Sequence, residues 1–405
     1  MKLLIAIEQH FIHGPEGHVW VRGPANYSLW SRYLEEFDEL VVLARVAPKV
    51  GSDDETARAD GPGVSFWALP DYHGPWQYLR DLRRLKAAVR RAVGECDAYI
   101  LRLPGLLGRL ALQEINGLGR PYALEVVGDP WDALGPGTWP SILRPFLRRA
   151  AVRQLRAACG SAMAVHYVTQ HALQRRYPPG DNAYAVGFSD ALMDSAFASP
   201  QILQQRNRRI DEMTQAGGNR RNRFRIGFIG SLARMYKGPD VLLRAAAECC
   251  SRGQDYDFVI VGDGRHAGAM KALAKRVGIG DRTRFVGQLP YGQAVFDFLD
   301  SVDLFVMPSR AEGLPRALLE AMARGCPCIG SEVGGIPELL DSVDMVPPGD
   351  SSALADRIIC GAGDTQRLKE MSERNLEKAR QYRPQVLEES RRVFYRKVRE
   401  RSVRL

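Results

Sequence analysis

The chain has 405 residues, of which 45% are hydrophobic and 25% charged, and its formal net charge is +9. This length exceeds one ordinary core and fits two domains of about 150–200 residues each, with a composition that excludes large-scale disorder. Seven scattered cysteines favour reduced thiols over a disulfide framework, and no stretch approaches the roughly 18 apolar residues of a membrane span.

Short β-rich apolar runs alternate with longer helical patterns along the chain, which is typical of parallel sheets covered by helices. The opening MKLLIAIEQHF predicts a buried strand and not a signal peptide, because polar residues interrupt its short apolar run. In the first half we predict strands at Leu3–Glu8, Glu39–Leu43, Ala98–Leu101, Tyr122–Val127 and Ala164–Val168. In the second half we predict strands at Phe224–Ile229, Asp257–Val261, Arg284–Val286, Leu304–Met307 and Pro327–Gly330.

The strand pattern pauses over residues 201–222, which are polar, rich in arginine and include Gly217-Gly218. We expect an interdomain linker there. Residues 1–200 then form an N-terminal, acceptor-side domain, and residues 223–383 form a C-terminal, donor-side domain. The tail, residues 384–405, has helical spacing of apolar positions and is expected to pack back across the first domain.

The positive charge is uneven. Residues 1–200 hold 22 Lys and Arg against 21 Asp and Glu, whereas residues 366–405 hold 13 against six. Two helical segments, Leu143–Arg156 and Tyr78–Val93, are strongly basic with apolar residues between the charges. Basic surface of this kind suits phosphate-bearing ligands, anionic lipid or nucleic acid. Such helices suit an anionic membrane surface or ordinary packing on a sheet.

The most informative stretch is SRAEGLPRALLEAMARGCPCIGSEVGG, residues 309–335. A buried strand leads into a loop with Glu312 and Gly313, and Pro315 opens a helix that carries Glu320. In open α/β sheets ligands bind at the carboxyl ends of strands, and a helix N-terminus there offers free N–H groups to phosphate. The two carboxylates therefore flank a predicted diphosphate site.

Two further loops follow strands in the same half of the chain. GSLARMYKG, residues 230–238, places Lys237 where its ammonium can bind phosphate. VGDG, residues 261–264, is a glycine turn that on its own fits many α/β proteins. Three strand-end loops in this order predict one nucleotide-binding site.

These motifs resemble the signature of retaining GT-B glycosyltransferases of family four, in particular EGLPRALLEAMARG with the later GGIPE. The resemblance is strong over residues 225–350 and weak before residue 200. It implies two Rossmann-like domains facing across a cleft. It also implies a UDP- or GDP-linked sugar donor, no cofactor, no metal and transfer with retention. The implied donor-binding residues are Gly230, Ser231, Arg234, Lys237, Gly262, Glu312, Gly313, Leu314 and Glu320.

By this resemblance Glu312 contacts the transferred sugar, Glu320 the ribose and Lys237 the diphosphate. The sequence departs from the pattern where many members have arginine after the glycine of the lysine loop, because Ser231 stands there and Arg234 follows three residues later. A second departure is Gly128 at the position of a family histidine, so Asp129 becomes the catalytic candidate of the first domain. Asp before Pro is also common turn chemistry.

The loop after the first strand, HFIHGPEGHVWVRG, makes Gly17 and His18 candidates for the acceptor side. We therefore expect a hexosyltransferase that moves sugar to a glycan or lipid-linked acceptor in cell-envelope polysaccharide or glycolipid assembly. It would be cytoplasmic and peripheral on the inner face of the membrane, with no nucleic-acid partner. The alternatives are a catalytically silent nucleotide-sugar-binding scaffold and another GT-B enzyme such as a nucleotide-sugar epimerase.

Overall fold

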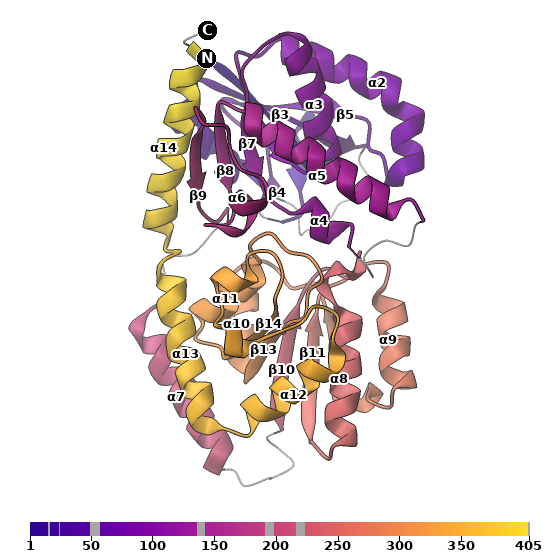
Figure 1. Ribbon diagram of the computed structural model, residues 1–405, viewed down its shortest axis with the longest axis vertical. Helices are drawn as coiled ribbons and strands as arrows, with labels where there is room; N and C mark the ends of the chain where they lie inside the picture. Colours follow the sequence, from indigo (N-terminus) through magenta and orange to yellow (C-terminus); the bar gives the residue numbers. More distant parts are fainter. Residues whose placement is uncertain are drawn as a thin grey trace. The chain divides into compact units, whose positions relative to one another are not determined.

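The computed structural model describes residues 1–14, 17–23, 25–48, 57–135, 142–190, 198–215 and 223–403. The chain divides into two compact units. Unit 1 comprises Met1–Gly128, Ala151–Asp190 and Leu387–Leu405, and unit 2 comprises Asp129–Ala150 and Ala191–Val386. Each unit has its own parallel sheet flanked by helices (Figure 1). Among the described residues, no helix is both long and apolar enough to cross a membrane.

Among the described residues, the sheet of unit 1 has nine strands, and seven of them run parallel in the order β5-β3-β1-β6-β7-β8-β9. Strands β2 and β4 form a short antiparallel extension that pairs with the end of β1. The bounds are β1 Lys2–His13, β2 Val19–Val21, β3 Glu39–Ala47, β4 Ala57–Arg58, β5 Val64–Leu69, β6 Ala98–Leu103, β7 Ala123–Val126, β8 Ala164–Tyr167 and β9 Tyr184–Gly187.

In the part of unit 2 that the structure describes, the sheet has six parallel strands in the order β12-β11-β10-β13-β14-β15. Counted from its own first strand, this is the order 3-2-1-4-5-6, the doubly wound arrangement in which ligands bind where the order reverses. The bounds are β10 Phe224–Ile229, β11 Tyr256–Val261, β12 Thr283–Gly287, β13 Leu304–Met307, β14 Cys328–Ser331 and β15 Met345–Val346. Unit 1 has the same order, with β9 added at one edge.

Helices connect the parallel strands, as crossovers between such strands require. Those that lie in unit 1 are α1 Tyr27–Trp30, α2 Gly74–Gly94, α3 Leu106–Gly117 and α6 Ala172–Arg176. Those that lie in unit 2 are α4 Pro130–Ala133, α7 Pro200–Gln215, α8 Pro239–Ser251, α9 Ala267–Arg276, α10 Gln293–Ser301, α11 Arg316–Ala323, α12 Ser351–Ala362 and α13 Thr365–Arg380. Helices α5 Arg144–Ser161 and α14 Pro384–Val403 continue from one unit into the other.

All ten predicted strands are present, with bounds that shift by a few residues at most except that β1 runs on to His13. These strands could be predicted from the sequence because their buried residues form apolar runs. In β13, for example, all four residues from Leu304 to Met307 are fully buried. The sequence analysis did not predict β2, β4, β5, β9 or β15. Strand β5 combines buried with half-exposed or exposed positions, and β9 has half-exposed and exposed positions only. Such mixed patterns give no clear apolar run.

The expected linker differs from the structure, which has helix α7 at Pro200–Gln215. Ile202 and Ile210 of this helix are buried, and between them lies Arg206, whose exposed fraction is 4%. The Arg206 guanidinium donates hydrogen bonds to the carbonyls of Val302 and Leu299 at 2.6 and 3.0 Å. These three residues are each four positions apart, about one helical turn, and therefore share one face of α7. Because the buried residue at the centre of that face is an arginine, the sequence of this packed helix has a polar pattern. Residues 216–222 lie outside the described residues.

Helix α14 packs along the β8 and β9 edge of unit 1 (Figure 1). Tyr395 stacks on Tyr33 with ring centroids 4.3 Å apart, and Phe394 is fully buried. Arg401 donates to the carbonyls of Met163 and Asn182 at 2.7 and 2.6 Å. The described part of the predicted C-terminal helix therefore completes the core of unit 1.

Candidate active site

The candidate site lies at the carboxyl ends of β10 and β13, the two neighbouring strands at which the strand order of unit 2 reverses. The loop after β10 carries Lys237, and the loop after β13 carries Glu312. Parallel strands end at the same edge of a sheet, so the two loops meet there. The topology explains why residues 75 positions apart form one site.

Arg310 holds these two loops together. Its backbone N–H donates to the carbonyl of Tyr236 at 2.6 Å, and its guanidinium donates to both oxygens of Asp240 at 2.8 and 2.7 Å. Gly238 makes the close approach possible, because it has φ of 71° and an added Cβ would lie 2.0 Å from the carbonyl oxygen of Pro308. The lysine loop is thus fixed against the loop that carries Glu312.

Lys237 and Glu312 form the centre of the site. The Lys237 ammonium donates to both carboxylate oxygens of Glu312 at 2.7 and 2.8 Å, and the Ser309 hydroxyl donates to Oε1 at 2.6 Å. Burial alone lowers the pKa of Lys237, but the Glu312 carboxylate more than offsets it, and the net pKa lies above its ordinary value. The site therefore holds a charged ammonium, preorganised by its carboxylate partner.

Helix α11 begins directly behind this pair. Its N-cap is Pro315, so no side chain caps the first turn among the described residues, and its first N–H groups remain available to an anion. The preceding loop is fixed by the Gly335 N–H, which donates to the carbonyl of Gly313 at 2.7 Å. Gly334 lies so close that a Cβ there would be 2.2 Å from the carbonyl oxygen of Glu312. The GG pair therefore holds Glu312 and Gly313 in place.

Glu320 lies on α11 and is 6% exposed. Burial raises the pKa of its carboxyl, and the positive charge of Arg316 partly opposes that shift. The two side chains approach to 3.7 Å. Within the described residues, the buried Nε of Arg316 has no hydrogen-bond partner. A buried carboxylate and a buried N–H group thus remain short of polar partners beside the helix N-terminus, as expected where a polar ligand completes the hydrogen bonding.

The remaining donor-side candidates lie in the loops after β10, β11 and β13. Gly230 and Gly262 lie in contact, since a Cβ on Gly262 would be 1.9 Å from the carbonyl oxygen of Gly230. The Ser231 hydroxyl accepts a hydrogen bond from the Ala233 N–H at 3.2 Å, so it stabilises its own turn. Arg234 is exposed, and Leu314 is buried at the base of the loop. These contacts bring Gly230, Gly262, Lys237 and Glu312 together in unit 2.

Asp129 is one of the candidates outside the two loops. It is 6% exposed, and its Oδ1 accepts a hydrogen bond from the Trp131 N–H at 2.7 Å. This is the N-cap of the short helix α4, the turn chemistry expected of Asp before Pro. Its catalytic role stays a prediction.

Gly17 and His18 belong to unit 1. Gly17 has φ of 79°, which glycine adopts without strain. The Nδ1 of His18 lies 3.0 Å from Oδ2 of Asp60, and Arg58 donates to the other oxygen of that carboxylate at 2.9 Å. Burial acts to raise the pKa of Asp60, but its hydrogen bonds with His18 and Arg58 outweigh this and leave the pKa lowered. The neighbouring residues 15 and 16 lie outside the described residues.

Three residues of the site were not singled out from the sequence. They are Ser309, which binds Glu312, Arg310, which joins the two loops, and Arg316, which lies beside Glu320. All three fall within the motif that drew attention to the glutamates. Arg316 carried a readable signal, because it is the first residue of a helix whose N-terminus was expected to bind diphosphate.

Comparison with known proteins agrees with this geometry. Residues 223–386 match the family described as glycosyl transferases group 1. Protein CapJ of Staphylococcus aureus is 26% identical over 330 residues, which cover 80% of this chain and 78% of CapJ. N-acetyl-alpha-D-glucosaminyl L-malate synthase of Bacillus anthracis is 37% identical over 123 residues, which cover 30% of this chain and 32% of that protein.

Solved structures show the same fold at low sequence identity. Sucrose-phosphate synthase from Thermosynechococcus elongatus aligns with a TM-score of 0.72 and 16% identity over 98% of each chain. Anabaena Alr3699/HepE, solved in complex with UDP and glucose, aligns with a TM-score of 0.64 and 19% identity over 100% of each chain. At these sequence identities the likeness concerns the fold.

Proposed function

We propose that this chain, a glycosyltransferase of the GT-B fold, moves a hexosyl group with retention from a UDP- or GDP-linked donor to a glycan or lipid-linked acceptor. The observation that carries the proposal is the buried pair of Lys237 and Glu312 beside the uncapped N-terminus of α11. A cation, a carboxylate and free N–H groups at one strand edge suit a diphosphate joined to a sugar.

The chemistry follows from the charges. A bound diphosphate competes with Glu312 for the Lys237 ammonium and leaves the carboxylate able to accept hydrogen bonds from sugar hydroxyls. As the bond to the sugar breaks, negative charge grows on the leaving diphosphate. Lys237 and the N–H groups of Gly313, Leu314 and α11 then stabilise that charge without a metal ion at this site. Retention rests on the likeness of the Glu312–Glu320 motif to the retaining family.

Glu320 and Arg316 would bind the nucleoside end of the donor. A ribose hydroxyl that donates to Glu320 supplies the hydrogen bond that a buried carboxylate needs. Arg316 Nε is positioned to donate to a phosphate or ribose oxygen. Ser231 and Arg234 border the same site, and Asp129 is proposed to contact the sugar.

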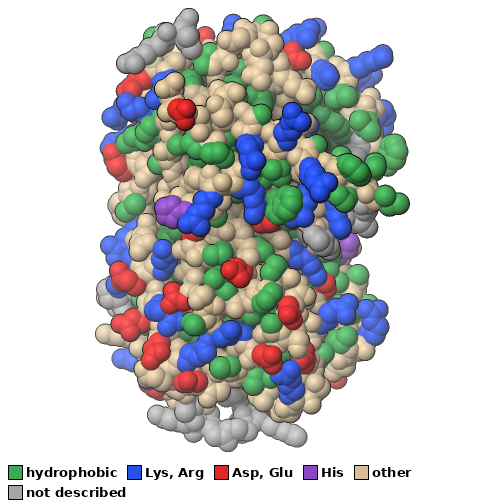
Figure 2. Space-filling model, viewed as in Figure 1, with side chains coloured by type: hydrophobic (Ala, Val, Ile, Leu, Met, Phe, Trp, Pro, Cys, Tyr) green, Lys and Arg blue, Asp and Glu red, His purple; other side chains and the backbone are tan. Residues whose placement is uncertain are grey.

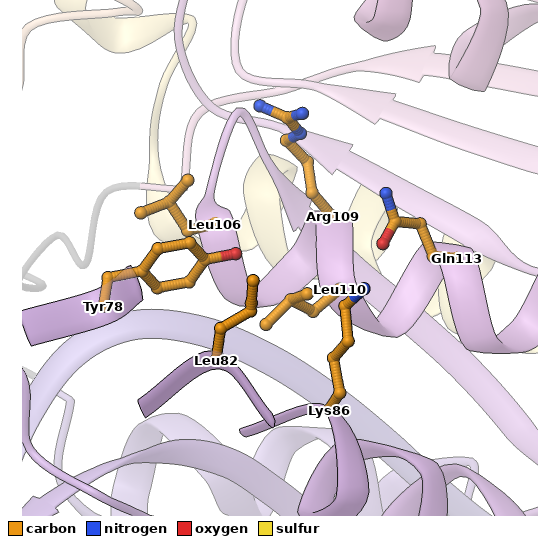
Figure 3. Close-up of a pocket in the computed structure, with 7 residues that line it drawn as sticks. All are labelled: Tyr78, Leu82, Lys86, Leu106, Arg109, Leu110 and Gln113. Atoms are coloured by element: carbon orange, nitrogen blue, oxygen red, sulfur yellow. The ribbon is translucent and has the colours of Figure 1, made fainter. Parts of the chain in front are cut away.

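The acceptor side belongs to unit 1 in this proposal, with Gly17 and His18 near it. A hollow of about 250 Å³ between α2 and α3 supports an amphiphilic acceptor (Figure 3). Its lining combines basic groups with apolar ones, which suits a phosphate joined to a hydrocarbon chain. The lining residues are Tyr78, Leu82, Lys86, Leu106, Arg109, Leu110 and Gln113.

Contact with an anionic membrane is the second part of the acceptor proposal. At the start of α5, Ile142, Leu143 and Phe146 are 95%, 62% and 69% exposed. Basic and hydrophobic side chains lie next to one another over this helix (Figure 2). Exposed apolar residues among arginines favour an interface with anionic lipid. With the similarity to CapJ, this supports cell-envelope polysaccharide or glycolipid assembly at the inner face of the membrane.

Calorimetry against a panel of nucleoside diphosphates and nucleotide sugars tests the donor site. We expect one base to bind selectively, and Lys237→Ala and Glu320→Ala to weaken that binding by about tenfold or more, as loss of a charge-assisted hydrogen bond predicts. Lys275→Ala, at an exposed position in the last turn of α9, is the matched control. Binding that the two site variants retain unchanged would contradict the assigned site.

Enzymatic transfer needs a separate assay. Incubation of the selected donor with membrane lipid extract should release nucleoside diphosphate and give a product with the anomeric configuration of the donor, which NMR reads directly. Nucleotide binding without any transfer would favour the scaffold alternative, and an inverted product would exclude retention. Phe146→Glu should reduce sedimentation with anionic vesicles while donor binding persists.

A further inference from the structure

A group of two histidines and an aspartate lies in unit 1, apart from every residue assigned above. His10 is on β1, and Asp71 and His73 are in the turn between β5 and α2. Among the described residues, it is the only group of at least three His, Cys, Asp or Glu side chains with one ligand atom each within 4.8 Å of the others. His10 and Asp71 are 61 residues apart in the sequence, and the fold of unit 1 brings them together.

Asp71 stands at the centre of this group. Its Oδ1 lies 2.6 Å from Nδ1 of His10, and its Oδ2 lies 3.0 Å from Nε2 of His73. The two imidazole rings stack with centroids 4.9 Å apart. One nitrogen from each ring therefore converges on one carboxylate.

We propose that His10, Asp71 and His73 form a binding site for a divalent transition-metal ion, with Zn²⁺ as the ion of best fit. Two imidazole nitrogens and one carboxylate oxygen are donors that Zn²⁺ and Co²⁺ share, and three protein ligands leave a position for water. In the structure each nitrogen faces the carboxylate at a hydrogen-bond distance. A metal ion would displace those hydrogens and be bound by His10 Nδ1, His73 Nε2 and a carboxylate oxygen of Asp71.

The nearby positive charge is that of Arg45. Arg45 itself is occupied, since it lies 3.3 Å from the Glu8 carboxylate and donates to the carbonyl of Tyr72 at 3.0 Å. Its charge is therefore largely balanced and does not exclude a cation from the site.

The side chains of the two histidines differ in their exposure to solvent. The side chain of His73 is 70% exposed, against 42% for His10 and 13% for Asp71. The stacked rings have to tilt for both nitrogens to face one ion, and the exposed His73 can do so at little cost. His10 and Asp71 would form the fixed half of the site, and His73 would close it. The bound ion would join β1 to the turn before α2.

This site is separate from the donor site, for which we expect no metal, and does not rest on the proposed transferase activity. The test uses the full chain without a histidine tag, stripped with EDTA and titrated with CoCl₂. We expect one equivalent of Co²⁺ to give visible d–d absorption bands, and Zn²⁺ to displace it. A chelator dye then gives the Zn²⁺ affinity.

His10→Ala, His73→Ala and Asp71→Asn should each lower Zn²⁺ affinity by at least about tenfold, since even outer-shell losses cost 10–100-fold. His13→Ala, on the same strand, is the matched control and should bind as the parent does. Circular dichroism establishes that each variant is folded. Absence of Co²⁺ bands in the parent, or equal affinity in all four variants, would overturn the proposal and leave Asp71 as a hydrogen-bond partner of two imidazoles only.

Discussion

The two units use the same strand order, yet they treat the equivalent helix N-terminus in opposite ways. In each sheet the fourth parallel strand in sequence leads to a helix at the point where the order reverses. These pairs are β6 and α3 in unit 1, and β13 and α11 in unit 2. In unit 1 the Glu8 carboxylate accepts a hydrogen bond from the Leu107 N–H of α3 at 2.5 Å. In unit 2 the first turn of α11 has no side-chain cap among the described residues.

The difference shows how one fold yields two kinds of site. We call the N-terminus of α3, which Glu8 occupies, the closed site, and the N-terminus of α11, which has no side-chain cap among the described residues, the open site. Glu8 supplies the anion that the N-terminus of α3 attracts, so that position is satisfied within the chain. At α11 the nearest carboxylate, Glu312, is instead bound by Lys237 and Ser309. The N–H groups of the first turn of α11 therefore remain available to an external anion. Lys237, which would bind the same anion, is already held beside them by Glu312. The doubly wound order alone therefore does not identify a nucleotide site, whereas the partners of the helix N-terminus do.

The largest expected effect comes from Glu312→Gln at the open site. Transfer should fall by about 10²–10³-fold, the usual cost of removing one preorganised electrostatic contact. Nucleoside-diphosphate binding should change little, because the diphosphate replaces Glu312 as the partner of Lys237. Steady-state kinetics and calorimetry on the same preparation separate the two quantities. An equal loss in both would show that Glu312 acts in holding the loop and not in transfer.

A smaller loss is expected from Arg310→Met, which removes the bidentate contact with the partly buried Asp240. The free energy of unfolding should fall by about 2 kcal/mol, less than for a fully buried pair. Donor affinity should fall as well, because the lysine loop is no longer held. Urea denaturation measures the first effect. Asp240→Asn is the paired variant, and a double-mutant cycle should give a clear coupling energy.

Glu8→Ala tests the closed site of unit 1. It leaves the α3 N–H without its acceptor and should lower the free energy of unfolding by about 1–2 kcal/mol, the cost of losing a cap. Glu8→Gln keeps an acceptor oxygen and should cost less. Thermal unfolding gives the ranking. If both variants unfold as the parent does, the Glu8 contact with α3 contributes nothing to stability.

The smallest effect is expected from Glu320→Gln. Burial raises the pKa of Glu320, so the folded protein binds this proton more tightly than the unfolded chain does. The stability that the protonated Glu320 carboxyl contributes is fully present below the pKa of this group in the unfolded chain. It is lost as the pH rises through the higher pKa of the same group in the folded protein. The variant should therefore show a flatter pH dependence above pH 4.5 and a slight gain in stability at pH 7. Unchanged curves would mean that the carboxyl is well solvated.

The sequence predicted the open site more fully than the closed one. Lys237 and Glu312 lie in loops at the ends of apolar strands, and Glu320 lies on the helix that follows one of these loops. Strand ends in an α/β pattern indicate ligand sites before any contact is known. The partners Ser309 and Arg310 could not be assigned, because nothing local distinguishes a hydroxyl or a guanidinium that binds within the protein from one in solvent. Glu8 was read only as an interruption of an apolar run.

Helix α7 and the cluster of His10, Asp71 and His73 were also not predicted, because both depend on contacts with residues far away in the sequence. Arg206 makes residues 201–215 read as polar, yet its guanidinium is saturated by carbonyl groups that lie about a hundred residues away. The cluster of His10, Asp71 and His73 depends on the register of β1 and the position of the turn after β5. Pattern reading finds elements that carry their own signal and misses those defined by a distant partner.

Helix α14 has a consequence for the order of synthesis. Tyr395 and Phe394 complete the core of unit 1, but they follow the whole of unit 2 in the chain. A ribosome therefore delivers every residue of unit 2 before unit 1 can bury Tyr33 and Phe188 beneath its last helix. The donor-side unit can fold while unit 1 still exposes an apolar edge. Until α14 emerges, that exposed edge makes the nascent chain prone to aggregation.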